Sequence, residues 1–361
     1  METPAESLSL RLAQRALELI RVPSVIGNER ALADLVEAWA TTRFGAAGVV
    51  RVSHSLAVGR RDDPRPAITL VGHLDTVPEN PDGTAPRLEG GRLVGLGSSD
   101  MKGSLAVMMA LADDLPLDTL PFNLRLVFYE REEGPFLESG LAPLFDAARE
   151  LERSVFAIAM EPTDGAVQVG CVGSLHARLL FEGQAAHSAR PWQGKNAIHA
   201  AGAVLVDLEK RGRHAVTVDG HTFFEVMSAT LAKGGRARNV VPDTFELNLN
   251  YRFAPGKTVA QAQEDVVQLA AGRCAVAFTD LAPSGRVCAA NPHFARLVSL
   301  SGRPAEAKQA WTDVARLSEW GLDAVNYGPG ETAQAHQRSE SAPIEALGQA
   351  YLALERLLRG R

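Results

Sequence analysis

Histidine and carboxylate side chains follow several apolar segments of this sequence, at positions where metal binding or acid–base chemistry would need them. His73 and Asp75 come directly after the apolar segment 67–72, which is typical of a buried strand. Side chains two residues apart on a strand point to the same face. Both therefore emerge together at the strand end, where open α/β sheets bind their ligands. A neutral imidazole is the commonest metal ligand, but a buried structural histidine held by a local aspartate explains the pair equally well.

Two further groups of carboxylates follow predicted strands in the same way. Glu132 and Glu133 come after the apolar segment 124–129, and Glu161 comes after 155–159. Adjacent carboxylates at a strand end repel each other unless a positive group lies beside them. A solvated acidic turn is the alternative for the first pair. Because three strand ends present histidine or glutamate, we predict a metal site where they meet.

A Gly/Ser-rich segment, 95–99, precedes Asp100 and a predicted helix over 104–115. The spacing of its glycines fits neither of the common phosphate-binding loop motifs. We expect glycine to let the backbone turn sharply, so that Asp100 reaches the helix N-terminus facing the site. An ordinary helix N-cap is the alternative for Asp100.

Composition and charge argue against several classes of protein. The chain has 361 residues, more than one hydrophobic core usually supports, so two domains are expected. A net charge of −6 argues against a nucleic-acid partner, and no apolar run approaches the roughly 20 residues of a membrane span. The acidic N-terminus is unlike a signal peptide. Three cysteines, far apart and in no C-x-x-C pair, predict reduced thiols in a cytoplasmic protein.

The order of predicted elements divides the chain into two domains. Helices and strands alternate over 1–167 and again over 280–361, which predicts an α/β catalytic domain with a central sheet flanked by helices. Residues 168–279 carry a βαββαβ succession, which is typical of an α+β split βαβ, or ferredoxin-like, sandwich. We expect this segment to be inserted into the catalytic domain as a lid or dimerisation domain.

The ordered set of polar residues resembles one known family. His73-x-Asp75, Asp100 after its Gly/Ser loop, Glu132-Glu133, Glu161-Pro162 and the later His187 and His336 are similar to the motifs of the dinuclear-zinc metallopeptidases. That family, which includes aminoacylases and carboxypeptidases, has a mixed central sheet in its catalytic domain. The resemblance covers nearly the whole chain. Within the family, the chain looks most like the enzymes that desuccinylate diaminopimelate, on the basis of segments 186–190, 239–242, 250–253, 311–313 and 326–330.

The resemblance implies two Zn²⁺ per subunit, with Co²⁺ as a substitute. It assigns His73 and Glu161 to one ion, Glu133 and His336 to the other, and Asp100 as the bridge. The charges agree, since three carboxylates and one bridging hydroxide balance two divalent ions. Without the ions, a buried cluster of acids would be very unfavourable.

The resemblance also implies the catalytic residues. Glu132 is expected to be the general base that takes a proton from the metal-bound water and passes it to the leaving amine. Asp75 would orient His73 from behind. His187, carried by the inserted domain, would stabilise the oxyanion in the partner subunit of a homodimer. A solvated loop histidine is the alternative for His187.

Two residues of the inserted domain are expected to contact the substrate. Asn239 and Arg252 match substrate-binding positions of the desuccinylases, and the fork of an arginine suits a carboxylate. Cross-strand pairing is the structural alternative for Arg252. Cys171 stands where some relatives carry an arginine, which leaves the residue that holds the succinyl carboxylate open.

The resemblance implies a cytoplasmic amide hydrolase that converts N-succinyl-LL-2,6-diaminopimelate and water to succinate and LL-2,6-diaminopimelate, a step of lysine biosynthesis. Another N-acyl amino-acid deacylase, of the N-acetylornithine deacetylase or aminoacylase type, is the first alternative. A metallo-carboxypeptidase or dipeptidase of the same fold is the second. A non-catalytic metal- or peptide-binding protein is a third.

Overall fold

The computed structural model describes residues 3–79 and 83–361, which form two compact units. The first unit comprises the described part of Met1–Gly170 with Arg286–Ala307 and Thr312–Arg361, and the second comprises Cys171–Gly285 with Lys308–Trp311. The predicted start, 168, lies three residues before the start of the second unit at Cys171, and the predicted end, 279, lies six residues before Gly285. Lys308–Trp311 was expected in the catalytic domain but groups with the second unit. That the inserted segment acts as a lid stays a prediction.

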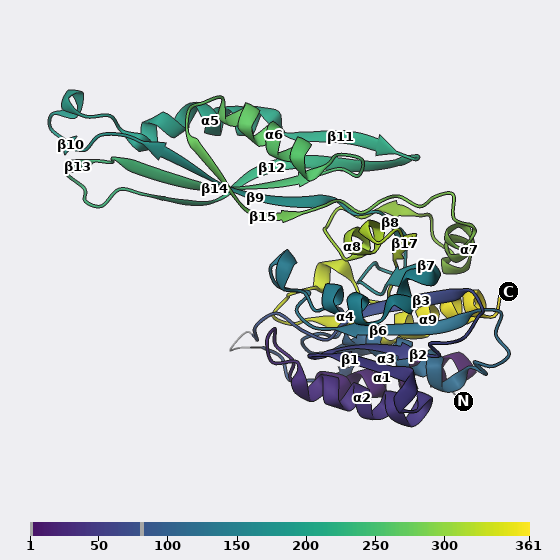
Figure 1. Cartoon of the computed structure of the whole chain (residues 1–361). Coiled ribbons are helices and arrows are strands. Elements are labelled where there is room, and N and C mark those ends of the chain that lie inside the picture. The colour runs from purple at the N-terminus through teal and green to yellow at the C-terminus, as the bar shows by residue number, and fades with distance from the viewer. Residues whose placement is uncertain (1–2, 80–82) are drawn as a thin grey trace. The chain divides into compact units, whose positions relative to one another are not determined.

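In the described part of the chain, an eight-stranded mixed sheet forms the centre of the first unit (Figure 1). In sheet order its strands are β1 (Val49–Val52), β2 (Ser55–Gly59), β6 (Asn123–Tyr129), β3 (Ala67–His73), β7 (Ser154–Ala159), β17 (Ala324–Asn326), β8 (Gln168–Val169) and β16 (Glu306–Ala307). β3 runs parallel to both β6 and β7. The carboxyl ends of these three strands therefore meet at one edge of the sheet.

The strands β3 and β6 are buried along their whole length. Parallel strands covered on both faces carry near-continuous apolar sequence rather than alternation, which matches the apolar segments that predicted them. A small antiparallel sheet of β18 (Ser341–Pro343), β5 (Arg92–Val94) and β4 (Arg87–Glu89) accompanies the central sheet.

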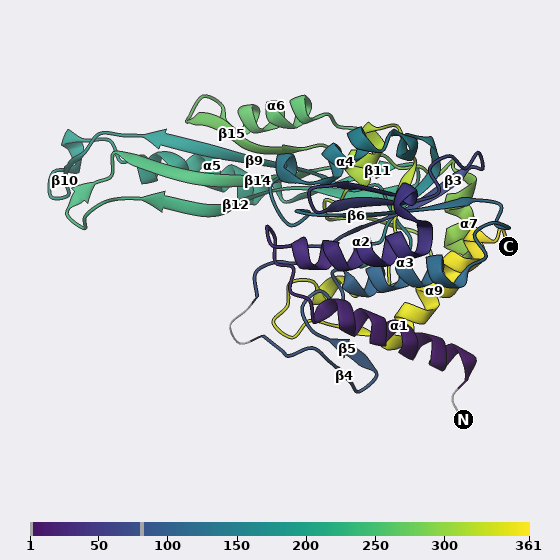
Figure 2. The same cartoon turned by 60° about the horizontal axis from the view of Figure 1, so that its bottom comes forward.

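Helices flank the central sheet of the first unit. They are α1 (Pro4–Ile20), α2 (Arg30–Phe44), α3 (Lys102–Asp114), α4 (Leu141–Ala147), α7 (Pro292–Ser301), α8 (Val314–Glu319) and α9 (Ile344–Leu358). α1 begins with a capping box between Thr3 and Glu6, with Pro4 in its first turn. α1, α3 and α9 pack against one another (Figure 2). α3 is buried from Lys102 to Ala112, as expected of a helix that is apolar on nearly every side.

The second unit is built on a five-stranded antiparallel sheet. In sheet order its strands are β11 (Arg213–Val218), β12 (His221–Gly234), β14 (Thr244–Phe253), β9 (Gly173–Glu182) and β15 (Ala275–Ala282). Helices α5 (Ala197–Arg211) and α6 (Val259–Ala270) pack on one face, against buried residues such as Leu179 and Leu249. β10 (Ala186–His187) and β13 (Val240–Val241) form a separate two-stranded sheet.

The predicted βαββαβ order is present as β9, α5, β12, β14, α6 and β15, with β11 added as a hairpin partner of β12. β11 was not predicted because most of its residues are exposed, so its sequence carries no apolar alternation. None of the helices in residues 3–79 and 83–361 is long and apolar enough to cross a membrane.

Candidate metal centre

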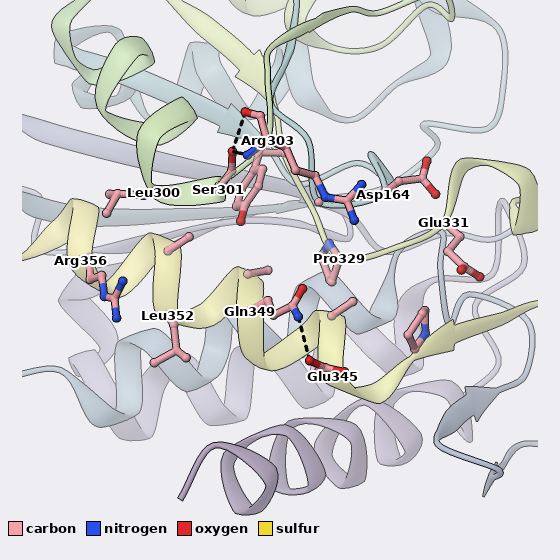
Figure 3. Close-up of a pocket in the computed structure, with 16 residues that line it drawn as sticks. Asp164, Leu300, Ser301, Arg303, Pro329, Glu331, Glu345, Gln349, Leu352 and Arg356 are labelled. Carbon is pink, nitrogen blue, oxygen red and sulfur yellow. Dashed lines mark hydrogen bonds between the residues drawn. The ribbon is translucent and has the colours of Figure 1, made fainter.

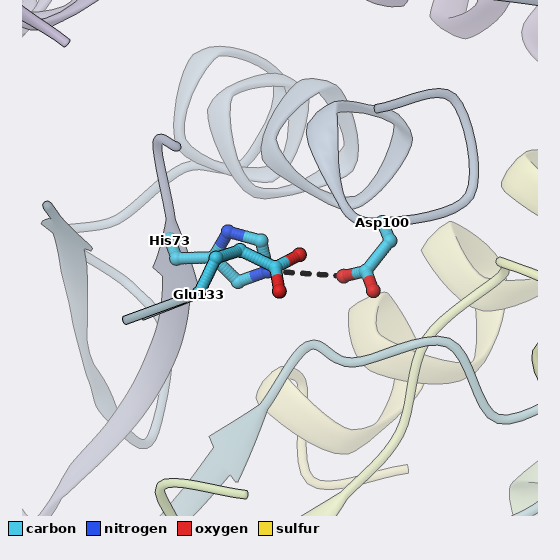
Figure 4. A group of neighbouring side chains, drawn as sticks. All are labelled: His73, Asp100 and Glu133. Carbon is cyan, nitrogen blue, oxygen red and sulfur yellow. Dashed lines mark hydrogen bonds and ion pairs between the residues drawn. The ribbon is translucent and has the colours of Figure 1, made fainter. Parts of the chain in front are cut away.

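Three predicted ligands converge at the carboxyl edge of the central sheet (Figure 4). His73 ends β3, Asp100 lies just before α3, and Glu133 lies in the turn that follows β6. Their ligand atoms all lie within 4.8 Å of one another. The Nε2 atom of His73 lies 3.0 Å from Oδ1 of Asp100. Residues separated by up to 60 positions in sequence thus form one cluster, which includes the residues at the ends of two of the three predicted strands.

His336 extends this cluster from the C-terminal part of the chain. Its Nε2 atom lies 2.8 Å from Oε1 of Glu133 and 3.6 Å from Oδ2 of Asp100. Glu161, directly after β7, is 7% exposed and lies outside the group of three whose ligand atoms converge. Its negative charge nevertheless contributes to the raised pKa of Glu132, so the two carboxylates face the same region.

Asp75 holds the turn that carries Glu132 and Glu133. The Asp75 carboxylate is fully buried and accepts hydrogen bonds from the backbone N–H groups of Glu132, at 3.0 Å, and of Glu133, at 2.9 Å. Asp75 also contacts His73. Nδ1 of His73 lies 3.0 Å from the backbone carbonyl oxygen of Asp75 and 3.6 Å from its carboxylate. Because a carbonyl only accepts, Nδ1 carries a proton and Nε2 faces the cluster.

The backbone conformation of Arg131 allows the turn that carries Glu132 and Glu133. Its backbone has φ +61°, in the left-handed region, and its side chain pairs with Glu138 at 3.2 Å. The left-handed residue turns the chain after β6, so that the next two N–H groups both meet Asp75. The guanidinium therefore takes no part in the carboxylate cluster itself.

Glu340 holds the segment that carries Asp100 and was not predicted as a site residue. It is 2% exposed, and its carboxylate accepts from the backbone N–H groups of Gly97, Ser99 and Asp100 at 3.1, 2.8 and 3.0 Å. Asp100 itself caps no helix, because α3 begins at Lys102 and has no side-chain cap. The N-cap alternative for Asp100 is therefore wrong.

Glu340 should matter for metal binding as well as for folding. We expect Glu340→Ala to weaken Zn²⁺ binding by about 10- to 100-fold, the usual effect of removing a group that orients a ligand. The free energy of unfolding should fall by about 2 kcal/mol or more, because three buried N–H groups lose their acceptor. Titration calorimetry and urea unfolding measure both quantities. The control Glu345→Ala removes an exposed carboxylate nearby, and Zn²⁺ affinity that responds equally to both substitutions would contradict this role.

The predicted site residues of the second unit lie in two places. His187 and Asn239 are both exposed. They lie close together, since the N–H group of Ser188, next to His187, donates to the Asn239 carbonyl at 2.9 Å. Nδ1 of His187 accepts from the N–H group of Ala189 at 3.1 Å. Arg252 lies instead on β14, where its Nε donates to Asn250 at 3.2 Å.

Residues 69–360 match peptidase family M20/M25/M40. The chain belongs to this family. A Mycobacterium tuberculosis protein that carries the provisional name succinyl-diaminopimelate desuccinylase DapE is 38% identical over 95% of this chain and 96% of its own length. A Corynebacterium glutamicum succinyl-diaminopimelate desuccinylase is 33% identical over 91% of each chain.

Solved structures of M20 peptidases share the fold. Aminopeptidase PepT from Bacillus cereus has a TM-score of 0.75 at 18% identity, over 97% of this chain and 98% of its own. The Bacillus subtilis protein YXEP, described as a dinuclear metal-binding peptidase from the M20 family, has a TM-score of 0.69 at 16% identity, over 98% of each chain. The predicted α/β fold with a mixed central sheet is thus confirmed.

The charges of the cluster formed by His73, Asp100, Glu133 and His336, called the M20 site below, are suited to divalent cations. Burial lowers the pKa of His73, but the hydrogen bond to Asp100 and the negative charges of Asp100, Asp75 and Glu132 together outweigh burial and leave the pKa well above its ordinary value. The hydrogen bond to Glu133 raises the pKa of His336 to about 9. Burial, followed by the charge of Glu161, raises the pKa of Glu132. Protons therefore supply the positive charge that this cluster requires, at nitrogen atoms that a metal ion could occupy instead.

A hollow of about 300 Å³ borders the M20 site, lined by His336, Thr76 and Lys102 among others. A separate hollow of about 460 Å³ lies beside α9 and contains Arg303 and Arg356 (Figure 3). None of the predicted site residues lines this second hollow. The hollow that borders His336 is therefore the one that matches the chemistry.

Proposed function

We propose that this M20-family chain hydrolyses the succinyl amide of N-succinyl-LL-2,6-diaminopimelate, giving succinate and LL-2,6-diaminopimelate. The observation that carries the proposal is the likeness to two relatives named for this reaction, over more than nine-tenths of each chain. The convergence of His73, Asp100 and Glu133 supports it, because an amide hydrolase of this family needs a site of that chemistry.

We propose zinc as the metal, with His73 and Glu161 holding one ion, Glu133 and His336 the other, and Asp100 shared between them. Two imidazoles and three carboxylates are ligands that zinc accepts. When bound, such ions polarise the substrate carbonyl and make the attacking water more acidic. The imidazoles of His73 and His336, each with Nε2 within 3.0 Å of a carboxylate oxygen, support this assignment.

Glu132 is the proposed general base. Its backbone is held by Asp75, and burial together with Glu161 raises its pKa, which makes the carboxylate a stronger proton acceptor. Glu132 accepts a proton from the water that attacks the amide carbon. As the C–N bond breaks, the same proton passes to the leaving amine, so charge and atoms balance.

Residues of the second unit are proposed to bind the substrate. Arg252 offers a guanidinium fork to a substrate carboxylate. His187 is proposed to stabilise the oxyanion in the partner subunit's site, with Asn239 as a substrate contact beside it. His187 and Asn239 are both exposed, and His187 lies on β10 while Asn239 directly precedes the partner strand β13, which supports a shared role.

We propose that the chain forms a homodimer through the edge of β12. This strand pairs with β14 along most of its length, but its pairing with β11 ends at Val226. Among the described strands, none pairs with the other edge of residues 227–234. Leu231 on this segment is 72% exposed, and Ile198, Leu205 and Val206 on α5 are exposed as well. Open strand edges with apolar side chains favour pairing with a second chain.

Thr230→Pro is expected to convert the dimer to a monomer, because proline removes a backbone donor and resists pairing in a strand. Light scattering coupled to gel filtration measures the mass. The control Thr217→Pro alters β11, which lies outside the proposed contact. A wild-type chain that is monomeric at micromolar concentration, or a dimer that Thr230→Pro leaves intact, would refute this interface.

Deacetylation of N-acetylornithine is the second candidate function. A Myxococcus xanthus acetylornithine deacetylase is 31% identical over 83% of this chain and 82% of its own. That substrate lacks the succinyl carboxylate, and one charge-assisted hydrogen bond contributes about 1.5–3 kcal/mol, or roughly 10- to 150-fold.

A substrate panel separates the candidates. We expect kcat/KM for N-succinyl-LL-2,6-diaminopimelate to exceed that for N-acetylornithine and for simple dipeptides by about 100-fold or more. Arg252→Ala should remove most of this preference. Faster turnover of N-acetylornithine would favour the deacetylase. A metal-loaded chain that hydrolyses none of the panel would favour a binding protein.

A further inference from the structure

The outer face of the second unit's sheet carries a chain of hydrogen bonds that ends on Arg252. Nε of Arg252 donates to Oδ1 of Asn250 at 3.2 Å. Nδ2 of Asn250 lies 2.8 Å from Nε2 of His176. Asn250 and His176 are direct cross-strand partners in the β14–β9 ladder. This face lies opposite the one that packs against α5 and α6, because Leu249 and Tyr251, which alternate with Asn250 and Arg252, are buried in the core.

The donor and acceptor atoms fix the direction of each hydrogen bond between Arg252, Asn250 and His176. A guanidinium only donates, so Oδ1 of Asn250 must face Arg252 and the amide nitrogen must face His176. Nε2 of His176 is then the acceptor. A neutral imidazole has one acceptor nitrogen, and the 2.8 Å contact with Asn250 occupies it. On the other side of the ring, Nδ2 of Asn248 lies 3.2 Å from Nδ1 of His176 and also donates to the Thr230 hydroxyl at 2.6 Å.

The chain of bonds fixes the plane of the guanidinium and leaves its fork available. Within the part of the protein that the structure describes, no hydrogen bond or ion pair of Nη1 or Nη2 of Arg252 is formed. These two groups are the pair that binds both oxygens of a carboxylate. Burial lowers the pKa of Arg252, and the negative charge of Asp280 acts against this shift. A partly desolvated guanidinium with an open fork favours an anionic ligand.

We propose that Asn250, supported by His176, is a positioning residue that presets the Arg252 guanidinium for two-point capture of a substrate carboxylate. The inference rests on the proposed substrate-binding role of Arg252. A guanidinium already held in its binding orientation loses less conformational freedom when the carboxylate arrives. Asn250 and His176 therefore act on substrate affinity through Arg252 and touch no reacting atom.

Steady-state kinetics of the zinc-loaded full chain tests this role. Asn250→Ala is expected to raise KM for N-succinyl-LL-2,6-diaminopimelate about tenfold, with kcat and zinc content unchanged. Asn250→Asp should raise KM further, because its carboxylate competes with the substrate for Arg252. Asn248→Ala is the matched control on the same strand, and its KM should stay within twofold of the wild-type value. His176→Gln keeps an acceptor and should retain more affinity than His176→Ala.

A double-mutant cycle separates positioning from a structural effect. Once Arg252 is alanine, adding Asn250→Ala should raise KM no further, whereas independent effects would multiply. The Arg252 Nε–H signal in a ¹H–¹⁵N spectrum gives a readout without substrate. We expect Asn250→Ala to speed its exchange with water at least tenfold and Asn248→Ala to leave it unchanged. Asn250→Ser provides a second variant if the alanine variant fails to fold.

The outcomes distinguish the inference from the proposed function. If Arg252→Ala raises KM but Asn250→Ala does not, the positioning role is wrong while substrate binding by Arg252 stands. If Arg252→Ala leaves KM unchanged, the proposed role of Arg252 itself fails. An Nε–H signal that responds equally to Asn248→Ala and Asn250→Ala would overturn the directed chain of bonds.

Discussion

Glu132→Gln is expected to lower kcat about 10³-fold, while zinc content and KM stay within about twofold of their wild-type values. Glutamine keeps the shape of the side chain but cannot accept the proton of the attacking water, and a positioned base contributes about 10²- to 10⁴-fold. The backbone of residue 132 should stay in place, because its hydrogen bond runs from its own N–H group to Asp75. Steady-state kinetics with metal analysis of the same sample measures each quantity.

Glu138→Gln is the matched control for this substitution. Glu138 is a carboxylate of the same loop region, exposed and paired with Arg131, so its amide should leave kcat within about twofold of the wild-type value. Turnover by Glu132→Gln at the wild-type rate would refute the assignment of the base. Loss of zinc from that variant would instead mean that Glu132 is a ligand.

Removal of the metal is expected to abolish turnover and to destabilise the fold. Each ion that binds only the folded chain adds about 4 kcal/mol of stability at a free concentration about 1,000 times its Kd. Chelator-treated protein should therefore unfold at a clearly lower temperature, and adding Zn²⁺ should restore both Tm and activity. Calorimetric scans with and without chelator test this, and a Tm that does not change on addition of chelator would argue against a resident metal.

Binding of Zn²⁺ to the metal-free protein should release protons. In the metal-free protein the pKa of His73 lies well above its ordinary value and that of His336 is about 9, so both rings are protonated at pH 7. An ion binds only the unprotonated nitrogen. Affinity should therefore rise with pH up to about 9 and fall as the solution is made acidic. Calorimetry at pH 7 in buffers of different ionisation enthalpy should report about two protons per chain, and none would contradict binding at these histidines.

Much of the first unit could be predicted because its parallel strands are buried on both faces. β3, β6 and β7 appear in the sequence as continuous apolar runs, and His73 at the end of β3 meets Glu133, which follows β6. The family and its fold, inferred from ordered motifs, are confirmed. β2, also buried along its length, was not predicted, because its five residues are too few to show a hydrophobic periodicity.

The residues that hold the ligands could not be predicted, because they act through backbone groups that leave no motif. Glu340 binds three N–H groups about 240 positions earlier in the chain, and nothing local in its sequence marks it. Asp75 was expected to orient His73 with its carboxylate, yet that carboxylate mainly holds the Glu132–Glu133 turn. The roles of Glu161, His187, Asn239 and Arg252 stay predictions, since they depend on bound metal, substrate or a second subunit.

An anomalous-difference map at the zinc edge, from crystals grown with Zn²⁺, tests the metal centre most directly. We expect two adjacent peaks, one beside His73 and Glu161 and the other beside Glu133 and His336, with Asp100 between them. Zinc bound elsewhere on the chain, or an ion at His73 that leaves Asp100 without a contact, would contradict the proposed dinuclear site.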